Sequence, residues 1–413
     1  MLLRQLSPVL VALLMLLAVP ELSPAQEHWS QWRGPRGDGS ADDPALPQTW
    51  SAENVVWKTP LPGSGQSSPV VWRDHVFLTA YRDEGSERIV MGLDRRTGKL
   101  LWEQTAWKGE PEETHTMNGW ASATCATDGE RVYAFFGHGG GLFCYSAEGE
   151  KLWNQPLGTF VGPWGTAACP MLLDNLVIQN CDADANASLM AFDKLTGDVV
   201  WKTPRENKRG WSTPFILRSD TTTQLILNGH TGVRSYDALS GRELWFCQGY
   251  NGRGEPTVTP DAAGNFIVVN GLAGDVYCVS PDPAQPMGEA HRVWNTPRRV
   301  GRDLPSPAVV GDQALVMSMQ GMLTSYQTAT GKKVWEQRVG GNYSASPTVW
   351  QGRAYFLGEE GETIVIDPQS PDRVVAKNTL GANSTELFRA SIAAHQGQLL
   401  IRSDQFLYCL EAK

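Results

Sequence analysis

The stretch Ala191-Phe-Asp193-Lys-Leu-Thr196-Gly197-Asp-Val-Val-Trp201 joins the end of one strand to the start of another through a polar turn. The aspartate side chain can bond its own turn backbone, and the glycine tolerates the positive φ that such a turn requires. Apolar residues return after the turn and end at a tryptophan. Copies of the pattern recur along the chain and end at Trp102, Trp153, Trp245, Trp294 and Trp335. A unit of strand, turn and strand is therefore repeated.

The tryptophans define the period of this repeat. Seven of them follow one another at intervals of 41 to 51 residues, at Trp57, Trp102, Trp153, Trp201, Trp245, Trp294 and Trp335. Periods of this length are typical of stacked four-stranded sheets. An eighth repeat places Val375 at the position of the tryptophan, and its strand and turn are present without the tryptophan. We therefore expect eight units, with the tryptophans docked in the space between neighbouring sheets.

The sequence between the tryptophans has the apolar alternation of β-strands and no helical segment. The first tryptophan unit, residues 53–60, has no three strands before it, whereas the last segment, residues 389–411, has three strands and no fourth. The predicted fold class is all-β: an eight-bladed β-propeller of four-stranded antiparallel blades, with the last blade completed by the N-terminal strand. Such a closure hides sheet edges that would otherwise recruit other chains.

The repeat small-x-Asp-x-x-Thr-Gly-x-x-x-Trp resembles the tryptophan-docking repeat of pyrroloquinoline quinone (PQQ) propellers over nearly the whole mature chain. That superfamily includes quinoprotein alcohol dehydrogenases and BamB-type outer-membrane assembly proteins, so the resemblance implies architecture more than activity. The segments Gln31-Trp32-Arg33-Gly34-Pro35 and Val56-Trp57-Lys58-Thr59-Pro60-Leu61-Pro62-Gly63 are also similar to secreted PQQ-like proteins of planctomycete-type bacteria. For those proteins the family implies no settled function.

The N-terminus predicts export. Arg4 precedes an apolar run at residues 9–19, and Ser23-Pro24-Ala25 supplies small residues suited to signal-peptidase cleavage. We expect a signal peptide at residues 1–25 that is cleaved near Ala25, an extension at 26–52 and the propeller at 53–413. The expected location is periplasmic or secreted. No cysteine stands at the cleavage point to carry a lipid, so no membrane anchor is predicted.

The net charge narrows the class of partner, and the cysteines are assigned from their place in the repeat. The net charge of −9 argues against nucleic acid. Of the seven cysteines, Cys144, Cys278 and Cys409 take the third-strand position that small residues hold in other units, and they are interpreted as packing residues. A Cys169–Cys181 disulfide is conceivable, but the spacing leaves the pairing open.

The candidate site is the face that we call the upper face, where the loops that lead into the first strand of each blade emerge. Aromatic and charged residues at these points suggest a funnel mouth that binds a ligand or partner, or else a plug that fills the channel. The candidate residues are Trp120, Trp164, Trp211, Glu255, Asp303, Tyr343, Phe388 and Arg389. The longest such loop, residues 104–119, is expected to overhang the mouth.

The sequence and the family resemblance lead to two functional hypotheses. The favoured one is an exported, non-catalytic binding or scaffolding module for a protein or extracellular polymer, with no cofactor and no metal. The alternative is a quinoprotein-like oxidoreductase that binds PQQ and calcium at the same face, where Glu255, Asp303, Asn118 and Asn270 are suitable oxygen donors. The chain lacks the Cys-Cys pair and the roofing insertions that the resemblance to the large dehydrogenases would imply, and no catalytic residue is assigned.

Overall fold

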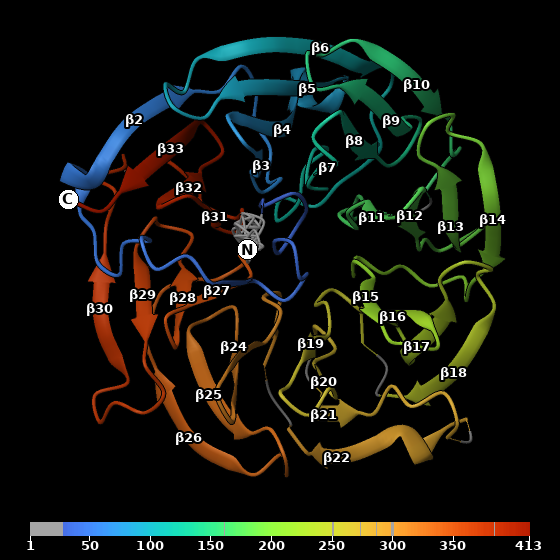
Figure 1. Ribbon diagram of the computed structural model, residues 1–413, viewed down its shortest axis with the longest axis vertical. Helices are drawn as coiled ribbons and strands as arrows, with labels where there is room; N and C mark the ends of the chain where they lie inside the picture. Colours follow the sequence, from blue (N-terminus) through green and yellow to red (C-terminus); the bar gives the residue numbers. More distant parts are fainter. Residues whose placement is uncertain are drawn as a thin grey trace, which may run out of the picture.

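Among the described residues of the computed structural model, seven four-stranded sheets and one five-stranded sheet surround a central axis (Figure 1). The structure describes residues 28–413 except 161, 250, 251, 273, 286, 299, 300 and 384. The predicted signal peptide, residues 1–25, lies outside the described residues. Within each blade the strands follow one another outward from the axis and pair antiparallel, so the predicted all-β, eight-bladed propeller is confirmed.

The first four blades take the strands from β3 to β18. Blade 1 contains β3 (Val70–Trp72), β4 (His75–Arg82), β5 (Glu87–Asp94) and β6 (Leu100–Lys108). Blade 2 contains β7 (Ala126–Thr127), β8 (Arg131–Phe136), β9 (Gly141–Ser146) and β10 (Lys151–Gln155). Blade 3 contains β11 (Met171–Leu173), β12 (Leu176–Cys181), β13 (Ser188–Asp193) and β14 (Val199–Pro204). Blade 4 contains β15 (Phe215–Arg218), β16 (Thr223–Asn228), β17 (Gly232–Asp237) and β18 (Glu243–Gln248).

The remaining blades complete the ring. Blade 5 contains β19 (Thr259–Pro260), β20 (Phe266–Val268), β21 (Val276–Val279) and β22 (Arg292–Thr296). Blade 6 contains β23 (Ala308–Val310), β24 (Gln313–Met317), β25 (Met322–Gln327) and β26 (Lys333–Arg338). Blade 7 contains β27 (Thr348–Trp350), β28 (Arg353–Leu357), β29 (Thr363–Ile366) and β30 (Val374–Asn378). Blade 8 contains β31 (Ala393–His395), β32 (Gln398–Arg402), β33 (Phe406–Glu411) and β2 (Val55–Pro60).

The ring is closed by β2, which pairs antiparallel with β33 and places Trp57 opposite Cys409. The predicted completion of the last blade by the N-terminal strand is confirmed. Within the described part of the chain, three short 3-10 helices lie in connections, at η1 (Ala52–Asn54), η2 (Asp83–Gly85) and η3 (Glu289–His291).

The segment before β2 runs along the inside of the ring before it reaches the rim (Figure 1). Its β1 (Ser40–Ala41) pairs parallel with β27, which makes blade 7 five-stranded. The carbonyl of Trp29 accepts the N–H of Val71 in blade 1, and the carbonyl of Ser30 accepts the N–H of Thr127 in blade 2. The N-terminal segment therefore contacts the inner strands of three blades.

Five of the tryptophans on the outermost strands tie each blade to the next. In each, the indole Nε1 donates to a turn carbonyl of the following blade over 2.6–3.2 Å; these tryptophans are Trp57, Trp102, Trp153, Trp201 and Trp294. The turn glycine packs on the same ring: a Cβ added at Gly241, where φ is +72°, would clash with the Trp201 indole. The glycine is therefore required both by the turn and by the packed indole.

The strand register shows which residue each indole faces. Cys144, Cys278 and Cys409 pair with the tryptophan of their own blade, as predicted for small packing residues. In blade 7 the equivalent position is Ala376, opposite Val365, and not Val375 as expected. The turn that begins at Asp367 is one residue longer than the Asp-x-x-Thr-Gly turns. The position equivalent to the docking tryptophan is therefore shifted by one residue.

All seven cysteines are buried and free. The conceivable Cys169–Cys181 disulfide is therefore absent. Cys169 instead accepts the backbone N–H of Thr124 on its Sγ over 3.2 Å, so it serves as a hydrogen-bond acceptor between blades.

Candidate functional site

A closed ring of hydrogen bonds surrounds the channel just before the inner strands. In each blade one backbone N–H donates to a side chain at the equivalent position of the next blade, over 2.8–3.2 Å, and the last blade donates to the first. The members are Ser68, Thr124, Cys169, Thr213, Thr257, Ser306, Ser346 and Ser391. Seven hydroxyls and one thiol thus satisfy eight buried N–H groups.

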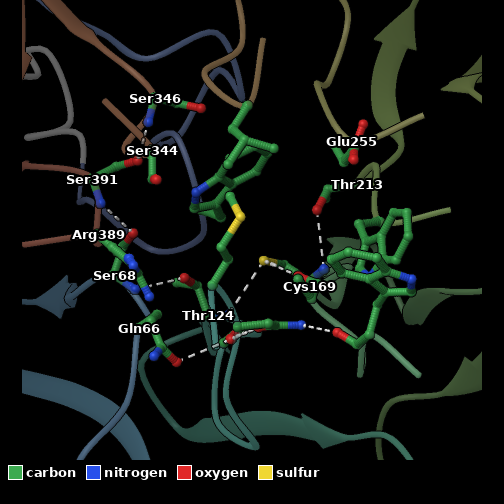
Figure 2. Close-up of a pocket in the computed structure, with 18 of the residues that line it drawn as sticks. Gln66, Ser68, Thr124, Cys169, Thr213, Glu255, Ser344, Ser346, Arg389 and Ser391 are labelled. Carbon is green, nitrogen blue, oxygen red and sulfur yellow. Dashed lines mark hydrogen bonds between the residues drawn. The ribbon is translucent and has the colours of Figure 1, made fainter. Parts of the chain in front are cut away.

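A cavity of about 190 Å³ lies within this ring. Figure 2 shows Ser68, Thr124, Cys169, Thr213, Ser346 and Ser391 around it. Trp32 of the N-terminal segment lines the cavity as well, and its neighbour Arg33 is fixed in the channel by bonds to Thr259 Oγ1 (3.0 Å) and to the Pro307 carbonyl (3.0 Å). Because Thr259 and Pro307 follow the ring residues along their strands, Trp32 reaches the cavity from the side opposite the upper loops. We call this cavity the central well.

The upper loops supply the mouth of the central well. The Trp164 indole is stacked between the His115 ring, 4.1 Å away between centroids, and the Arg253 guanidinium, whose Cζ lies 4.5 Å from the indole centroid. The Cζ of Arg302 lies 6.0 Å from the same ring. The Trp211 Nε1 donates to the Gly165 carbonyl over 2.9 Å, which links the loops of blades 3 and 4. These contacts fix the aromatic side chains without using the polar atoms of Arg253.

Glu255 is the acidic residue of the well. Burial raises its pKa to about 7, and the nearby Arg302 and Arg253 charges offset this effect only in part. Its Oε1 lies 4.0 Å from Arg302 Nη2, too far for a hydrogen bond. Its Oε2 is pressed against Gly271, where any Cβ would clash, and has no hydrogen-bond partner among the described residues. The well therefore holds a carboxyl group whose pKa is raised by burial toward neutral pH.

Arg389 belongs to the lining but is engaged by its neighbours. Its Nε donates to Glu359 Oε1 over 3.2 Å, and its Nη1 donates to the Thr116 carbonyl over 2.9 Å. The second bond joins the long loop that leads into blade 2 to the loop that leads into blade 8. Met117 and Asn118 of that loop line the well. Residues 104–108, which were expected in this loop, instead extend β6, because β5 and β6 pair as far as Glu87 and Lys108.

The structure divides the eight predicted site residues into two groups. Trp164, Trp211, Glu255 and Arg389 line the central well. The other four, Trp120, Asp303, Tyr343 and Phe388, are not among its lining residues.

Each residue of the second group has a structural contact of its own. Trp120 packs edge-on against Tyr81 and donates its Nε1 to the Glu112 carbonyl. Asp303 is buried and paired with Arg298, whose Nη1 lies 3.0 Å from its Oδ1. Tyr343 and Phe388 are buried in hydrophobic clusters between blades.

Several lining residues were not predicted. Trp32 lies in the extension, outside the repeat, so its position in the channel has no counterpart in the periodic pattern. Arg253 and Arg302 stand in upper loops, but nothing in their local sequence separates them from ordinary surface arginines. Members of the hydrogen-bond ring share a pattern in the sequence. A Ser, Thr or Cys precedes a proline at Ser68, Cys169, Thr213, Ser306 and Ser346.

Fold and site together define a PQQ-repeat propeller with a narrow polar and aromatic well on its axis. The family model described as outer membrane protein assembly factor BamB matches residues 49–160, 86–297 and 273–401. The chain therefore belongs to this family. No curated protein matches it in sequence.

Solved structures share the fold at low identity. BamB from Moraxella catarrhalis is 16% identical with a TM-score of 0.64, and the alignment covers 87% of this chain and 97% of that one. A europium-containing methanol dehydrogenase is 11% identical with a TM-score of 0.54, covering 91% and 89%. The computationally designed Ika8 protein is 10% identical with a TM-score of 0.59, covering 86% and 98%. At these identities the likeness establishes the fold alone.

Metal-binding clusters and membrane-spanning helices are both absent from the described residues. No group of three or more His, Cys, Asp or Glu side chains within them is placed to hold a metal ion. No helix among them combines the length and apolar character that a membrane span requires.

Proposed function

We propose that the chain is an exported, non-catalytic binding module whose upper face takes a segment of a partner protein into the mouth of the central well. The observation that carries the proposal is the well itself: aromatic side chains fixed by their neighbours stand beside charged atoms that the fold does not use. Buried polar atoms without partners are costly in a fold, so their presence in a cavity favours a ligand.

The family supports a protein partner. The matching family model is described as an outer membrane protein assembly factor, BamB, and one of the structural neighbours is a BamB. A factor that assembles proteins must contact them, which favours a protein as the partner. A periplasmic location is consistent with the signal peptide predicted at residues 1–25. An extracellular polymer is the second candidate partner for the same surface, since indoles also stack on sugars.

The oxygen donors proposed for calcium give a quinoprotein activity weaker support than the binding role has. Among the four proposed calcium ligands, Asp303 is ion-paired with Arg298, and Asn118 donates to the Trp164 carbonyl and accepts the Gly119 N–H. Asn270 accepts a hydrogen bond from Tyr277. Glu255 then faces two arginines, an environment that repels a divalent cation. These side chains do not fit a calcium site, although the arginines are compatible with an organic anion.

The test is site-specific photo-crosslinking in cells that make the protein. A photoreactive residue at Met117, on the rim of the well, should give a discrete crosslinked species that disappears when Trp164→Ala and Trp211→Ala are added. The same probe at Leu239, which is 65% exposed in a turn of blade 4, serves as the control. Identical products at both positions, or no product at Met117, would refute a partner at the upper face.

A parallel assay addresses catalysis. Purified protein is incubated with PQQ and calcium, and both the quinone absorption and dye-coupled alcohol oxidation are recorded. The binding-module proposal predicts no turnover. Calcium-dependent alcohol oxidation that Glu255→Gln abolishes would replace it with the quinoprotein alternative.

A further inference from the structure

We propose that the central well binds a carboxylate attached to an aromatic or apolar group, with the carboxylate held by Arg253 and Arg302 next to Trp164. The inference rests on the proposed function, because it names the chemistry of the group that enters the well. The carboxylate can belong to a free organic acid or to the end or a side chain of a peptide.

The charges of the well favour an anion. Three arginines and one glutamate line it, in a protein whose net charge is −9. The charge of Arg389 is balanced by Glu359, whereas Glu255 is the one acidic group that Arg253 and Arg302 share among the described residues lining the well, and it lies 4.0 Å from Arg302. The corner around Trp164 therefore has an excess of positive charge, and this excess grows when Glu255 takes up a proton.

Unpartnered donors point to the same chemistry. Arg253 Nη1 and Arg302 Nε are buried and have no hydrogen-bond partner in the described part of the chain. A buried guanidinium N–H without an acceptor is unfavourable, and a carboxylate matches two such groups at once. Both guanidinium groups lie near the Trp164 ring, within 4.5 and 6.0 Å of its centroid, so one anion beside that ring can face both.

The ring below the mouth adds donors rather than acceptors. Each hydroxyl of the ring accepts a backbone N–H, and a hydroxyl that accepts can still donate its own proton, as Thr257 does to the Thr213 carbonyl. Ser68, Thr124, Thr213, Ser346 and Ser391 line the well. The Thr124 and Thr213 hydroxyls lie within hydrogen-bonding reach of the Cys169 thiol, whereas those of Ser68, Ser346 and Ser391 donate to no other described residue. A ligand that enters therefore meets O–H and N–H groups, which suits carboxylate oxygens.

The apolar part of the lining selects what the carboxylate is attached to. Trp32 faces the cavity from below, and Met117, Leu304 and Trp211 contribute apolar surface at the walls and mouth. A bare, fully hydrated ion would gain nothing from these side chains. Burial of an aromatic or aliphatic group against them supplies hydrophobic free energy in addition to the charge interaction.

Isothermal titration calorimetry with matched probes tests the inference. Indole-3-acetate supplies an aromatic carboxylate, indole-3-acetamide is its uncharged counterpart, and inorganic phosphate is an anion without an apolar group. We expect indole-3-acetate to bind about tenfold or more tightly than the other two, as loss of a charge-assisted bond implies. Equal binding of acid and amide, or preference for phosphate, would overturn the proposal.

Variants assign the binding to the two arginines. Arg253→Gln and Arg302→Gln should each weaken indole-3-acetate binding by about tenfold, because an amide lacks the charge and the forked donors. Arg218→Gln, which removes an exposed arginine paired with Asp174, is the matched control and should bind as the parent does. If a glutamine variant fails to fold, Arg→Lys at the same position keeps the charge and should give intermediate affinity. Unchanged binding in both arginine variants would refute the site.

A peptide arm identifies the source of the carboxylate. N-acetyl-glycyl-tryptophan is compared as free acid and as amide: tighter binding of the peptide acid than of indole-3-acetate indicates a peptide carboxylate, and the reverse indicates a free organic acid. If no acid binds while the Met117 crosslink still forms, the carboxylate inference is wrong and the binding-module proposal stands. If acids bind but no crosslink forms, the inference stands and a macromolecular partner is excluded.

Discussion

Gln224 Oε1 accepts the indole Nε1 of Trp245 over 3.0 Å, and Gln224 Nε2 donates to the Pro281 carbonyl of the next blade over 3.0 Å. The same relay joins Trp335, Gln313 and Pro368 between blades 6 and 7. Five other indoles bond a turn carbonyl directly. Blades 5 and 7 have proline-containing turns in place of the Thr-Gly turn, and in both cases the glutamine side chain bridges to a proline carbonyl.

The relay predicts a stability effect at a residue that contacts no ligand. Gln224→Ala leaves the buried Trp245 N–H without an acceptor and should lower the free energy of unfolding by about 1–3 kcal/mol. Chemical denaturation with urea measures the change. Gln369→Ala, at an exposed turn position, is the control and should have no effect. Equal stability of the two variants would show that the relay does not stabilise the ring.

The thiol in the hydrogen-bond ring gives a second prediction. Cys169→Ser places an eighth hydroxyl in the ring and should preserve or slightly raise stability, because oxygen is a better acceptor than sulfur. Cys169→Ala removes the acceptor for the buried Thr124 N–H and should cost about 1–3 kcal/mol. Thermal unfolding of both variants measures the difference. If alanine and serine behave alike, the side chain at position 169 is only a space filler.

Glu255 gives a pH-dependent prediction. Its pKa is raised from 4.5 in the unfolded chain to about 7 in the fold, so ionisation opposes folding. The parent protein should lose stability from this group as the pH rises from about 4.5 to 7. Glu255→Gln removes the loss and should be more stable at pH 8 by up to about 3 kcal/mol, with no gain at pH 4. Urea denaturation at both pH values measures this.

The control for this experiment is Glu110→Gln, in an exposed stretch of the blade 2 loop. It should show no difference between the two pH values. A Glu255→Gln protein that is less stable than its parent at pH 8 would mean that the arginine contacts outweigh the burial of the carboxylate.

Truncation tests the closure of the ring. Removal of residues 26–63 eliminates β2 and exposes the edge of β33, which should lower the melting temperature and promote association through the free edge. Removal of residues 26–52 alone keeps β2 but takes away Trp32 and Arg33, so the ring should fold with a well open at both ends. Differential scanning calorimetry and light scattering measure both effects. An unchanged melting curve for the longer truncation would contradict the closure.

The fold could be read from the sequence because its signals are local and repeated. Turn chemistry, strand alternation and tryptophan spacing all recur with one period, and the unmatched strands at the two ends, residues 53–60 and 389–411, indicate closure. The repeat position of the eighth unit was predicted at Val375 and lies at Ala376, because the turn before it departs from the repeat length.

The site was harder to predict because sequence position does not give side-chain direction. Trp164 and Phe388 occupy comparable upper loops, yet the first faces the well and the second is buried between blades. Asp303 resembles Glu255 in the sequence, but its pairing with Arg298 depends on three-dimensional contacts. Trp32 reaches the well only because the N-terminal segment runs along the inner strands, which no periodicity could reveal.

Binding of a carboxylate in the central well can be seen directly in a crystal structure of the protein soaked with 4-bromophenylacetate, with data collected at the bromine absorption edge. We expect an anomalous bromine peak inside the central well, with the carboxylate facing Arg253 and Arg302 and the ring against the indoles. Bromine peaks only at other places on the molecule, or a well that stays empty at saturating ligand, would contradict the proposed carboxylate site.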